Sequence, residues 1–140
     1  MKDVTVRNSL GVLLISVHLV IIALLFGGYL LHGLSFDQMT TAIAVVAPIS
    51  AAYVGIVVKT FLQATPRRSA PKDVAGTFVF TVFSFPIAFS VFLISVILMF
   101  VLNKAFDTFE EFKIALALGE TLFGVYITKI VAALFPKHSP

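Results

Sequence analysis

The chain contains four long apolar stretches, which are joined by short polar segments and leave few residues over. They lie at residues 10–34, 40–62, 76–102 and 112–135. A helix rises about 1.5 Å per residue, so roughly 20 apolar residues cross a bilayer core of about 30 Å. Hydrophobic residues make up 59% of the chain, whereas soluble domains contain about 45–50%. The stretches therefore predict an integral membrane protein with four spans.

All four spans are expected to be helices. A lipid-exposed backbone must form its hydrogen bonds within one segment, and the sequence lacks the alternating segments of about ten residues that mark a membrane β-barrel. The spans take up most of the 140 residues, so we expect one domain over residues 1–140. The predicted fold is an all-α, four-helix transmembrane bundle.

Basic residues predict the orientation, because cytoplasmic loops carry an excess of Lys and Arg. The segment 63–74 contains Arg67, Arg68 and Lys72, and both ends of the chain carry basic residues, while the loop after the first span has only Asp37. We expect both termini to face the cytoplasm, in a bacterial inner membrane. The basic loop either anchors the chain or docks an acidic partner or anionic lipid. Because the net charge of +3 comes from span ends, no nucleic-acid partner is expected.

Small residues mark the expected helix contacts. Lipid does not drive helices together as water does, so close packing needs small side chains. The second span carries Ala47, Ala51 and Gly55 at intervals of four residues, and the fourth span carries Gly124. We expect these residues to pack against another helix, either within one protomer or between the protomers of a homo-oligomer.

The third span combines hydroxyl side chains on one face with phenylalanines on the others. Hydroxyl groups in lipid bond to their own backbone or across to a neighbouring helix. We therefore expect the hydroxyl face to turn inward, with these residues: Thr77, Thr81, Ser84, Ala88 and Ser95.

An acidic residue lies deep in the fourth span. Glu120 is about eight residues, or about 12 Å, from the start of the span, where an acid costs roughly 2.5–3.5 kcal/mol on insertion scales. It is expected to face the bundle interior or a water-filled cavity, with Thr121 and Thr128 on the same face of the helix. The predicted ion-interacting residues are these three and His18.

His18 lies inside the first span and is the candidate partner of Glu120. Counted from the span ends, it lies one or two turns closer to the cytoplasm, so water or a hydroxyl such as Ser84 or Thr128 would bridge the two. Structural roles also fit both residues: a neutral imidazole bonded to a backbone carbonyl, and a paired or protonated acid. The functional interpretation is a site that interacts with protons or cations.

Catalysis is not expected. The chain has no cysteine, and it shows neither a metal-ligating cluster nor a nucleophile–base–orienter set in register. The sequence therefore indicates no enzyme, no metal site and no cofactor, and its evident partner is the lipid bilayer.

Three functions fit this pattern. The first is a homo-oligomeric channel whose pore forms between protomers and is lined by Glu120, Thr121 and Thr128, with rings of Glu120 that favour cations. The alternative is a membrane-embedded interaction protein, such as an immunity or regulatory subunit, or a membrane-disrupting defence effector controlled by a cytoplasmic partner. The third is a small transporter with a substrate-sized pocket near His18 and Glu120.

Overall fold

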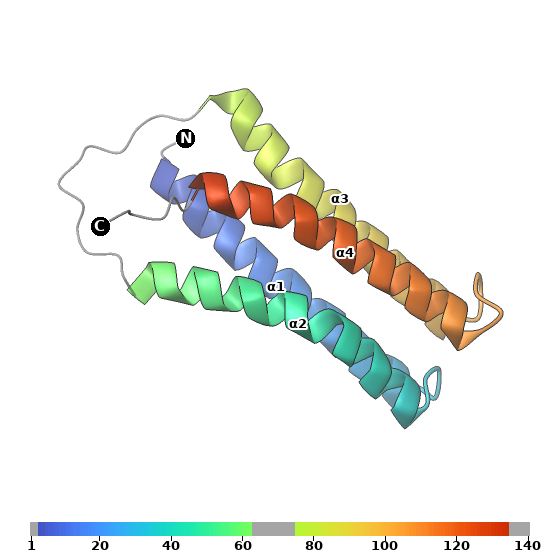
Figure 1. Ribbon diagram of the computed structural model, residues 1–140. Coiled ribbons are helices and arrows are strands. Elements are labelled where there is room, and N and C mark those ends of the chain that lie inside the picture. The colour runs from blue at the N-terminus through green and yellow to red at the C-terminus, as the bar shows by residue number, and fades with distance from the viewer. Residues whose placement is uncertain (1–2, 63–74, 135–140) are drawn as a thin grey trace.

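The computed structural model describes residues 3–62 and 75–134 (Figure 1). Within these residues the fold is all-α and contains four helices: α1 (Asp3–Leu30), α2 (Phe36–Leu62), α3 (Gly76–Val101) and α4 (Phe109–Leu134). The prediction of four helices is confirmed. By length and composition, two of them can cross a membrane, at Val4–Leu30 and Gly76–Val101. The basic loop with Arg67, Arg68 and Lys72 lies outside the described residues.

The helices form a four-cornered bundle. α1 packs against α2 and α3, and α4 packs against the same two helices. α1 and α4 therefore face each other across the bundle. The short turns at 31–35 and 102–108 lie at one end, termed the hairpin end (Figure 1). The first residues of α1 and α3 lie at the opposite end, termed the terminal end.

The helices that run toward the hairpin end, α1 and α3, stop in the same way. His32 after α1 and Asn103 after α3 adopt left-handed backbone angles, with φ of 60° and 53°. His and Asn tolerate this region better than most residues do. In each case the next amide N–H donates to the carbonyl oxygen five residues earlier, at 2.9 Å after α1 and 2.8 Å after α3. This is the Schellman motif, and it satisfies carbonyl groups that the helix end leaves without an intrahelical partner.

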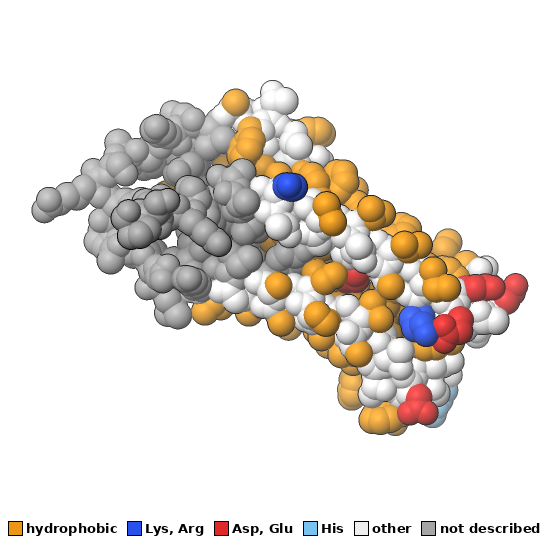
Figure 2. All heavy atoms as spheres, in the orientation of Figure 1, with side chains coloured by type: hydrophobic (Ala, Val, Ile, Leu, Met, Phe, Trp, Pro, Cys, Tyr) orange, Lys and Arg blue, Asp and Glu red, His pale blue; other side chains and the backbone are white. Residues whose placement is uncertain are grey.

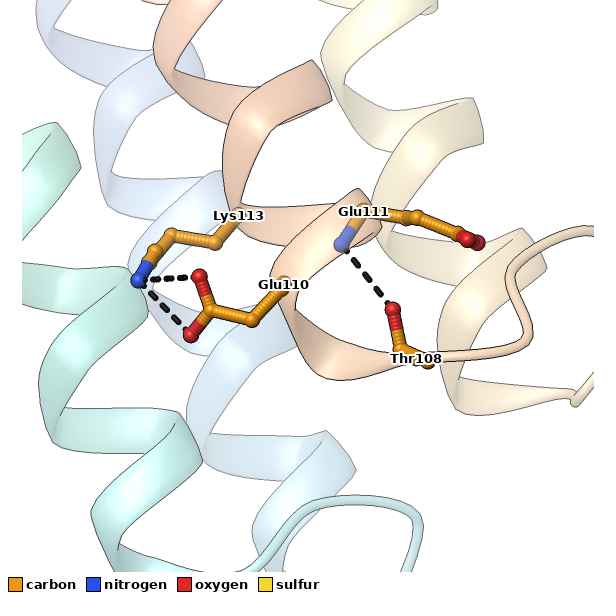
Figure 3. A network of polar contacts seen from close by, with 4 residues as sticks. All are labelled: Thr108, Glu110, Glu111 and Lys113. Carbon is orange, nitrogen blue, oxygen red and sulfur yellow. Dashed lines mark hydrogen bonds and ion pairs between the residues drawn. The ribbon is translucent and has the colours of Figure 1, made fainter.

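The two returning helices each begin with a capping box. At α2, the Gln38 N–H donates to Ser35 Oγ at 3.2 Å, and the Ser35 N–H donates to Gln38 Oε1 at 2.9 Å. At α4, the Glu111 N–H donates to Thr108 Oγ1 at 3.3 Å (Figure 3). The Glu111 carboxylate in turn accepts from the backbone N–H just before the cap, at 3.1 Å. Such boxes satisfy amide groups that have no partner within the helix.

The interior holds two separate apolar clusters. The hairpin cluster lies toward the hairpin end and has these buried members: Ile21, Leu25, Leu34, Met39, Ala42, Val46, Leu93, Val96, Ile97, Phe100, Phe112 and Leu116. The terminal cluster lies toward the terminal end and has these: Val6, Leu10, Leu14, Val82, Phe123 and Ile127. Hydrophobic side chains also line the outside, and acidic side chains gather at the hairpin end (Figure 2). An apolar outer surface of this extent is unusual for a soluble monomer.

The inward face of α3 differs from the predicted one. Thr77, Thr81 and Ala88 are exposed, so the prediction of an inward hydroxyl face was wrong. Thr81 Oγ1 donates to the carbonyl oxygen of Thr77 at 3.0 Å, and Ser95 Oγ donates to its own helix at 2.7 Å. Because own-helix bonds satisfy these hydroxyls, they have no need to face inward. The buried face of α3 has these residues instead: Val82, Pro86, Ser90, Leu93, Val96, Ile97 and Phe100.

Candidate functional site

Among the described residues, four buried polar side chains, one from each helix, lie between the two apolar clusters. They are His18, Ser50, Ser90 and Glu120, with relative exposures of 3%, 8%, 6% and 1%. At about 1.5 Å of rise per residue, each lies about 16 to 21 Å from the hairpin-end terminus of its helix. That spread is about one helical turn of 5.4 Å. We term these four residues the polar layer.

Glu120 is the acidic member of the polar layer. Both of its carboxylate oxygens are buried, and neither has a hydrogen-bond partner among the described residues. The neighbouring Gly119 lets α4 approach α3 closely, because a Cβ atom there would lie 2.8 Å from Leu93 Cδ2 and 2.9 Å from a ring carbon of Phe92. An ionised carboxylate in a dry interior is costly unless a positive charge or hydrogen-bond donors compensate it. The position of Glu120 therefore calls for a proton or a cation.

His18 reaches across the bundle toward α4. Its ring centroid lies 5.6 Å from that of Phe123, which follows Glu120 by three residues. His18 Nδ1 lies 2.8 Å from the carbonyl oxygen of Leu14. A carbonyl oxygen only accepts hydrogen bonds, so Nδ1 carries a proton and donates it to Leu14. His18 thus brings an ionisable ring to the depth of Glu120.

The two serines of the polar layer use their hydroxyl hydrogens within their own helices. Ser50 Oγ and Ser90 Oγ each donate to the carbonyl oxygen four residues earlier, at 3.0 and 2.6 Å. Both hydroxyl oxygens can therefore only accept hydrogen bonds from other groups. Sequence reasoning missed these residues and named Ser84 and Thr128 instead. The available signal was spacing, because Ser90 continues the buried face of α3 four residues after Pro86.

The structure divides the predicted ion-interacting residues into two groups. His18 and Glu120 are both buried and lie at nearly the same depth, not one or two turns apart as predicted. The error arose because α1 ends at Leu30, before the predicted residue 34, and α4 begins at Phe109, before the predicted residue 112. Thr121 and Thr128 are exposed on α4, and each donates to its own helix at 2.7 Å. Within one chain, the threonines do not join the buried pair.

The predicted packing residues lie toward the outside of the single chain. Ala51 and Gly55 are exposed, and Ala47 and Gly124 are half-buried. A Cβ atom on Gly55 would meet nothing within 4 Å. Among the described residues, therefore, Gly55 makes no close helix contact within the chain, and a contact between protomers stays a prediction.

Two further observations bear on what the polar layer can bind. Groups of three or more His, Cys, Asp or Glu side chains that could hold a metal ion are absent from the described part of the chain. A groove of about 570 Å³ lies between α1 and α3, lined by Asn8, Ser9, Val12, Leu13, Ser16, Phe83 and Ile87. Because no member of the polar layer lines this groove, it does not connect the buried acid with a substrate-sized space.

The fold and the polar layer define a class: an apolar-surfaced four-helix bundle with a buried acid and a buried imidazole at mid-length. Comparison of the chain with protein-family models, with curated proteins and with solved structures finds no match. The polar layer is therefore the guide to function.

Proposed function

We propose that the protein is an integral membrane protein with four spans that conducts or transports small cations, protons included, through the interior of its own bundle. The observation that carries the proposal is Glu120, an acid that is 1% exposed and whose two oxygens have no hydrogen-bond partner among the described residues. Ionisable residues within spans are costly, face the bundle interior, and mark ion or proton pathways. In this proposal both termini lie in the cytoplasm and the hairpin end faces outward.

The two apolar clusters support a gated pathway. The polar layer has the hairpin cluster on one side and the terminal cluster on the other. Apolar constrictions exclude water and block ions until they widen. An ion at Glu120 would therefore be held between two closed barriers, and conduction requires at least one of them to open.

Burial favours a pathway inside the bundle over a pore between protomers. Glu120 faces inward, whereas Thr121 and Thr128 are exposed on the outside of α4. These three residues cannot line one pore while the bundle keeps this arrangement. We therefore assign the ion pathway to Glu120 and His18 and leave the exposed threonines outside it.

The test is an ion-flux measurement on the purified protein in planar bilayers and liposomes. Glu120→Gln removes the ionisable group and keeps the size of the side chain, and we expect it to lower flux by at least about tenfold, since a functional acid contributes factors of this order or more. Glu110→Gln is the matched control, because Glu110 is an exposed acid on the same helix. Circular dichroism of each variant verifies that the bundle still folds.

Two results would reject the proposal. The absence of ion current and ion flux at all voltages and pH values would exclude an ion-handling function. Loss of flux in Thr121→Val or Thr128→Val, with Glu120→Gln unaffected, would place the pathway between protomers. Flux that depends on Glu120 and not on the threonines would support a pathway through the bundle.

The exposed small face of α2 favours a second candidate, a membrane-embedded interaction protein that associates with its own copies or with another membrane protein. Ala51 and Gly55 are exposed there, and small residues let two helix backbones approach closely in lipid. The chain has no cysteine, so any disulfide crosslink between two chains must form through a single cysteine that is introduced by mutation. We expect Gly55→Cys to form disulfide-linked dimers in membranes and Leu118→Cys, on the exposed side of α4, to form none. Equal crosslinking of both variants would argue against a specific α2 interface.

A further inference from the structure

We infer that the groove between α1 and α3 binds one anionic phospholipid of the leaflet at the terminal end, with an acyl chain in the groove and the headgroup beside the first turns of α1. This inference rests on the membrane location proposed above and not on the handling of ions. Three features of the chain carry it: the depth of the groove, the chemistry of its walls and the charge at the terminal end.

The groove lies at the depth of a single leaflet. Its α1 wall runs from Asn8 to Ser16, or about 12 Å along the helix, and half of a bilayer core is about 15 Å thick. α1 has 28 residues and is about 42 Å long, so a centred helix extends about 6 Å beyond the core at each end. Asn8 lies about 8 Å from the start of α1. The groove therefore begins where lipid headgroups meet acyl chains.

The groove exists because α1 and α3 diverge toward the terminal end (Figure 1). Near the hairpin end the two helices are close, since Cβ atoms on Gly28 and on Gly33 of the following turn would each lie 2.8 Å from a methyl carbon of Val101. Toward the terminal end, Val12 and Ile87 are exposed on the two sides of the groove. In the membrane location, this space of about 570 Å³ is open to lipid.

The apolar walls of the groove suit an acyl chain better than a helix of another protein. They consist of Val12 and Leu13 on α1, and of Phe83 and Ile87 on α3. Helices approach each other closely in lipid through small residues such as Gly and Ala, whereas large branched and aromatic side chains keep a second backbone away. An acyl chain is thin and flexible, so it can lie along such walls.

The α1 wall also carries polar side chains that lack partners. Asn8, Ser9 and Ser16 form no side-chain hydrogen bond among the described residues. In contrast, Thr121 and Thr128 on the outside of α4 each donate to their own helix at 2.7 Å. An amide or hydroxyl without a partner is costly in hydrocarbon. The phosphate and ester oxygens of a phospholipid are acceptors, so they can receive hydrogen bonds from Asn8 and Ser9 at the start of the groove.

Positive charge gathers toward the terminal end. By sequence position, eight of the ten Lys and Arg residues belong to the helix halves, chain ends and connecting segment on that side: Lys2, Arg7, Lys59, Arg67, Arg68, Lys72, Lys129 and Lys137. The acidic residues of the same segments are Asp3 and Asp73. Lys and Arg near a membrane surface attract anionic lipids, and Arg7 directly precedes Asn8 on α1. The charge therefore favours an anionic headgroup over a zwitterionic one.

The experiment uses the absence of tryptophan from the chain, because a single introduced Trp is then the only indole fluorophore. Phe83→Trp places it on the groove wall. Phe80→Trp is the control, at a position on the same helix that is 72% exposed and faces bulk lipid. Each variant is reconstituted into phosphatidylcholine vesicles in which a minor fraction of lipid, either phosphatidylglycerol or phosphatidylcholine, carries brominated acyl chains. Bromine quenches tryptophan fluorescence on contact.

We expect Phe83→Trp to show an apparent affinity for brominated phosphatidylglycerol at least about fivefold above that for brominated phosphatidylcholine, which is the effect of one nearby Lys or Arg. Phe80→Trp should respond equally to both lipids. Val12→Phe in the Phe83→Trp background fills the groove from the opposite wall and should abolish the preference. Val125→Phe, the same change at an exposed position of α4, should leave it unchanged. Circular dichroism verifies that each variant folds.

Equal quenching of Phe83→Trp by the two lipids would overturn the inference and leave the membrane location standing. A preference that survives Val12→Phe would also overturn it, because the lipid would then lie elsewhere. Protection of Phe83→Trp from both lipids, with Phe80→Trp quenched, would show that a second copy of the chain covers the groove in place of lipid. No quenching of either variant would reject the membrane location together with this inference. Since none of these outcomes depends on ion flux, a failure of ion handling is distinguishable from a failure of lipid binding.

Discussion

The two halves of the bundle are built differently. The hairpin half has the larger apolar cluster, two Schellman motifs and two capping boxes. The three described glycines at tight contacts, Gly28, Gly33 and Gly119, lie toward the hairpin end or at mid-length. A Cβ atom on Gly55 or Gly76 of the terminal half would meet nothing within 4 Å, and the same holds for Gly27 of the hairpin half. In Figure 1 the helices also fan out toward the terminal end. The polar layer lies where a tightly packed half meets a more loosely packed one, so under the proposed function the terminal side is the side expected to open.

The largest effect should come from removing a ring of the hairpin cluster. Phe112 is fully buried and stacks on Phe100 with ring centroids 4.4 Å apart. Phe112→Ala should cost about 3 kcal/mol, near the lower end of Phe→Ala losses, because in the proposed membrane location lipid outside the bundle weakens the transfer contribution. Phe123→Ala should cost less, about 2 kcal/mol, because the more loosely packed side chains of the terminal half can move into the cavity that the removed ring leaves. Unfolding in mixed detergent micelles, followed by circular dichroism, measures both.

The same pair of variants separates the halves by function. Phe123 belongs to the terminal cluster and contacts the His18 ring. Under the proposed function, Phe123→Ala should therefore raise Glu120-dependent flux, and Phe112→Ala should not. An increase with Phe112→Ala alone would place the barrier that opens at the hairpin end.

Two neighbouring glycines test the tight contact between α1 and α3. A Cβ atom on Gly28 would lie 2.8 Å from Val101 Cγ2 and 3.0 Å from Leu34 Cδ1, whereas one on Gly27 would meet nothing within 4 Å. Gly28→Ala should cost about 1–2 kcal/mol through overpacking. Gly27→Ala should stabilise the helix by up to about 1 kcal/mol, because alanine is the better helix former. Equal effects in thermal unfolding would show that α1 and α3 do not touch closely there.

Local sequence signals predicted the helices well. The stretches of apolar residues placed α2 and α3 within a few residues of their observed bounds, and all four helices were expected. The first helix was misplaced at both ends. It begins earlier because the polar residues from Asp3 onward continue the helix, and it ends earlier because His32 takes the left-handed conformation. Hydropathy does not report either feature.

The site was predictable in part. Glu120 and His18 were singled out because ionisable residues inside spans are rare, and both are buried. Their shared depth was missed, because depth depends on where the helices end. Ser50 and Ser90 were missed because a hydroxyl can satisfy itself on either face of a helix. Which face turns inward is decided by packing volume, and the stripe of α3 that contains Val82 and Leu93 fills the core better than its hydroxyl face.

The capping boxes are expected to contribute less than the core. Thr108→Ala removes the side chain that caps Glu111 at the start of α4, and Ser35→Ala removes the equivalent group at α2. Each should cost about 1 kcal/mol. Thr40→Ala is a suitable control, because its hydroxyl bonds back to carbonyl oxygens of the helix that already contains it. Amide hydrogen exchange should show faster opening of the first turn of α4 in Thr108→Ala, and unchanged protection there would mean that packing alone holds the turn.

The smallest effect should come from the charge pair on the surface of the hairpin half. Lys113 Nζ lies 2.6 Å from a Glu110 carboxylate oxygen, three residues earlier on α4 (Figure 3). Exposed pairs of this kind contribute about 0–1 kcal/mol, because water and salt screen them and two long side chains lose freedom. Lys113→Gln should therefore lower stability by about 0.3 kcal/mol, and high salt should erase the difference. A loss of unfolding free energy above about 1 kcal/mol that persists at high salt would contradict this comparison. It would mean that surface charge, and not the buried cluster and the caps, makes the hairpin half the more stable one.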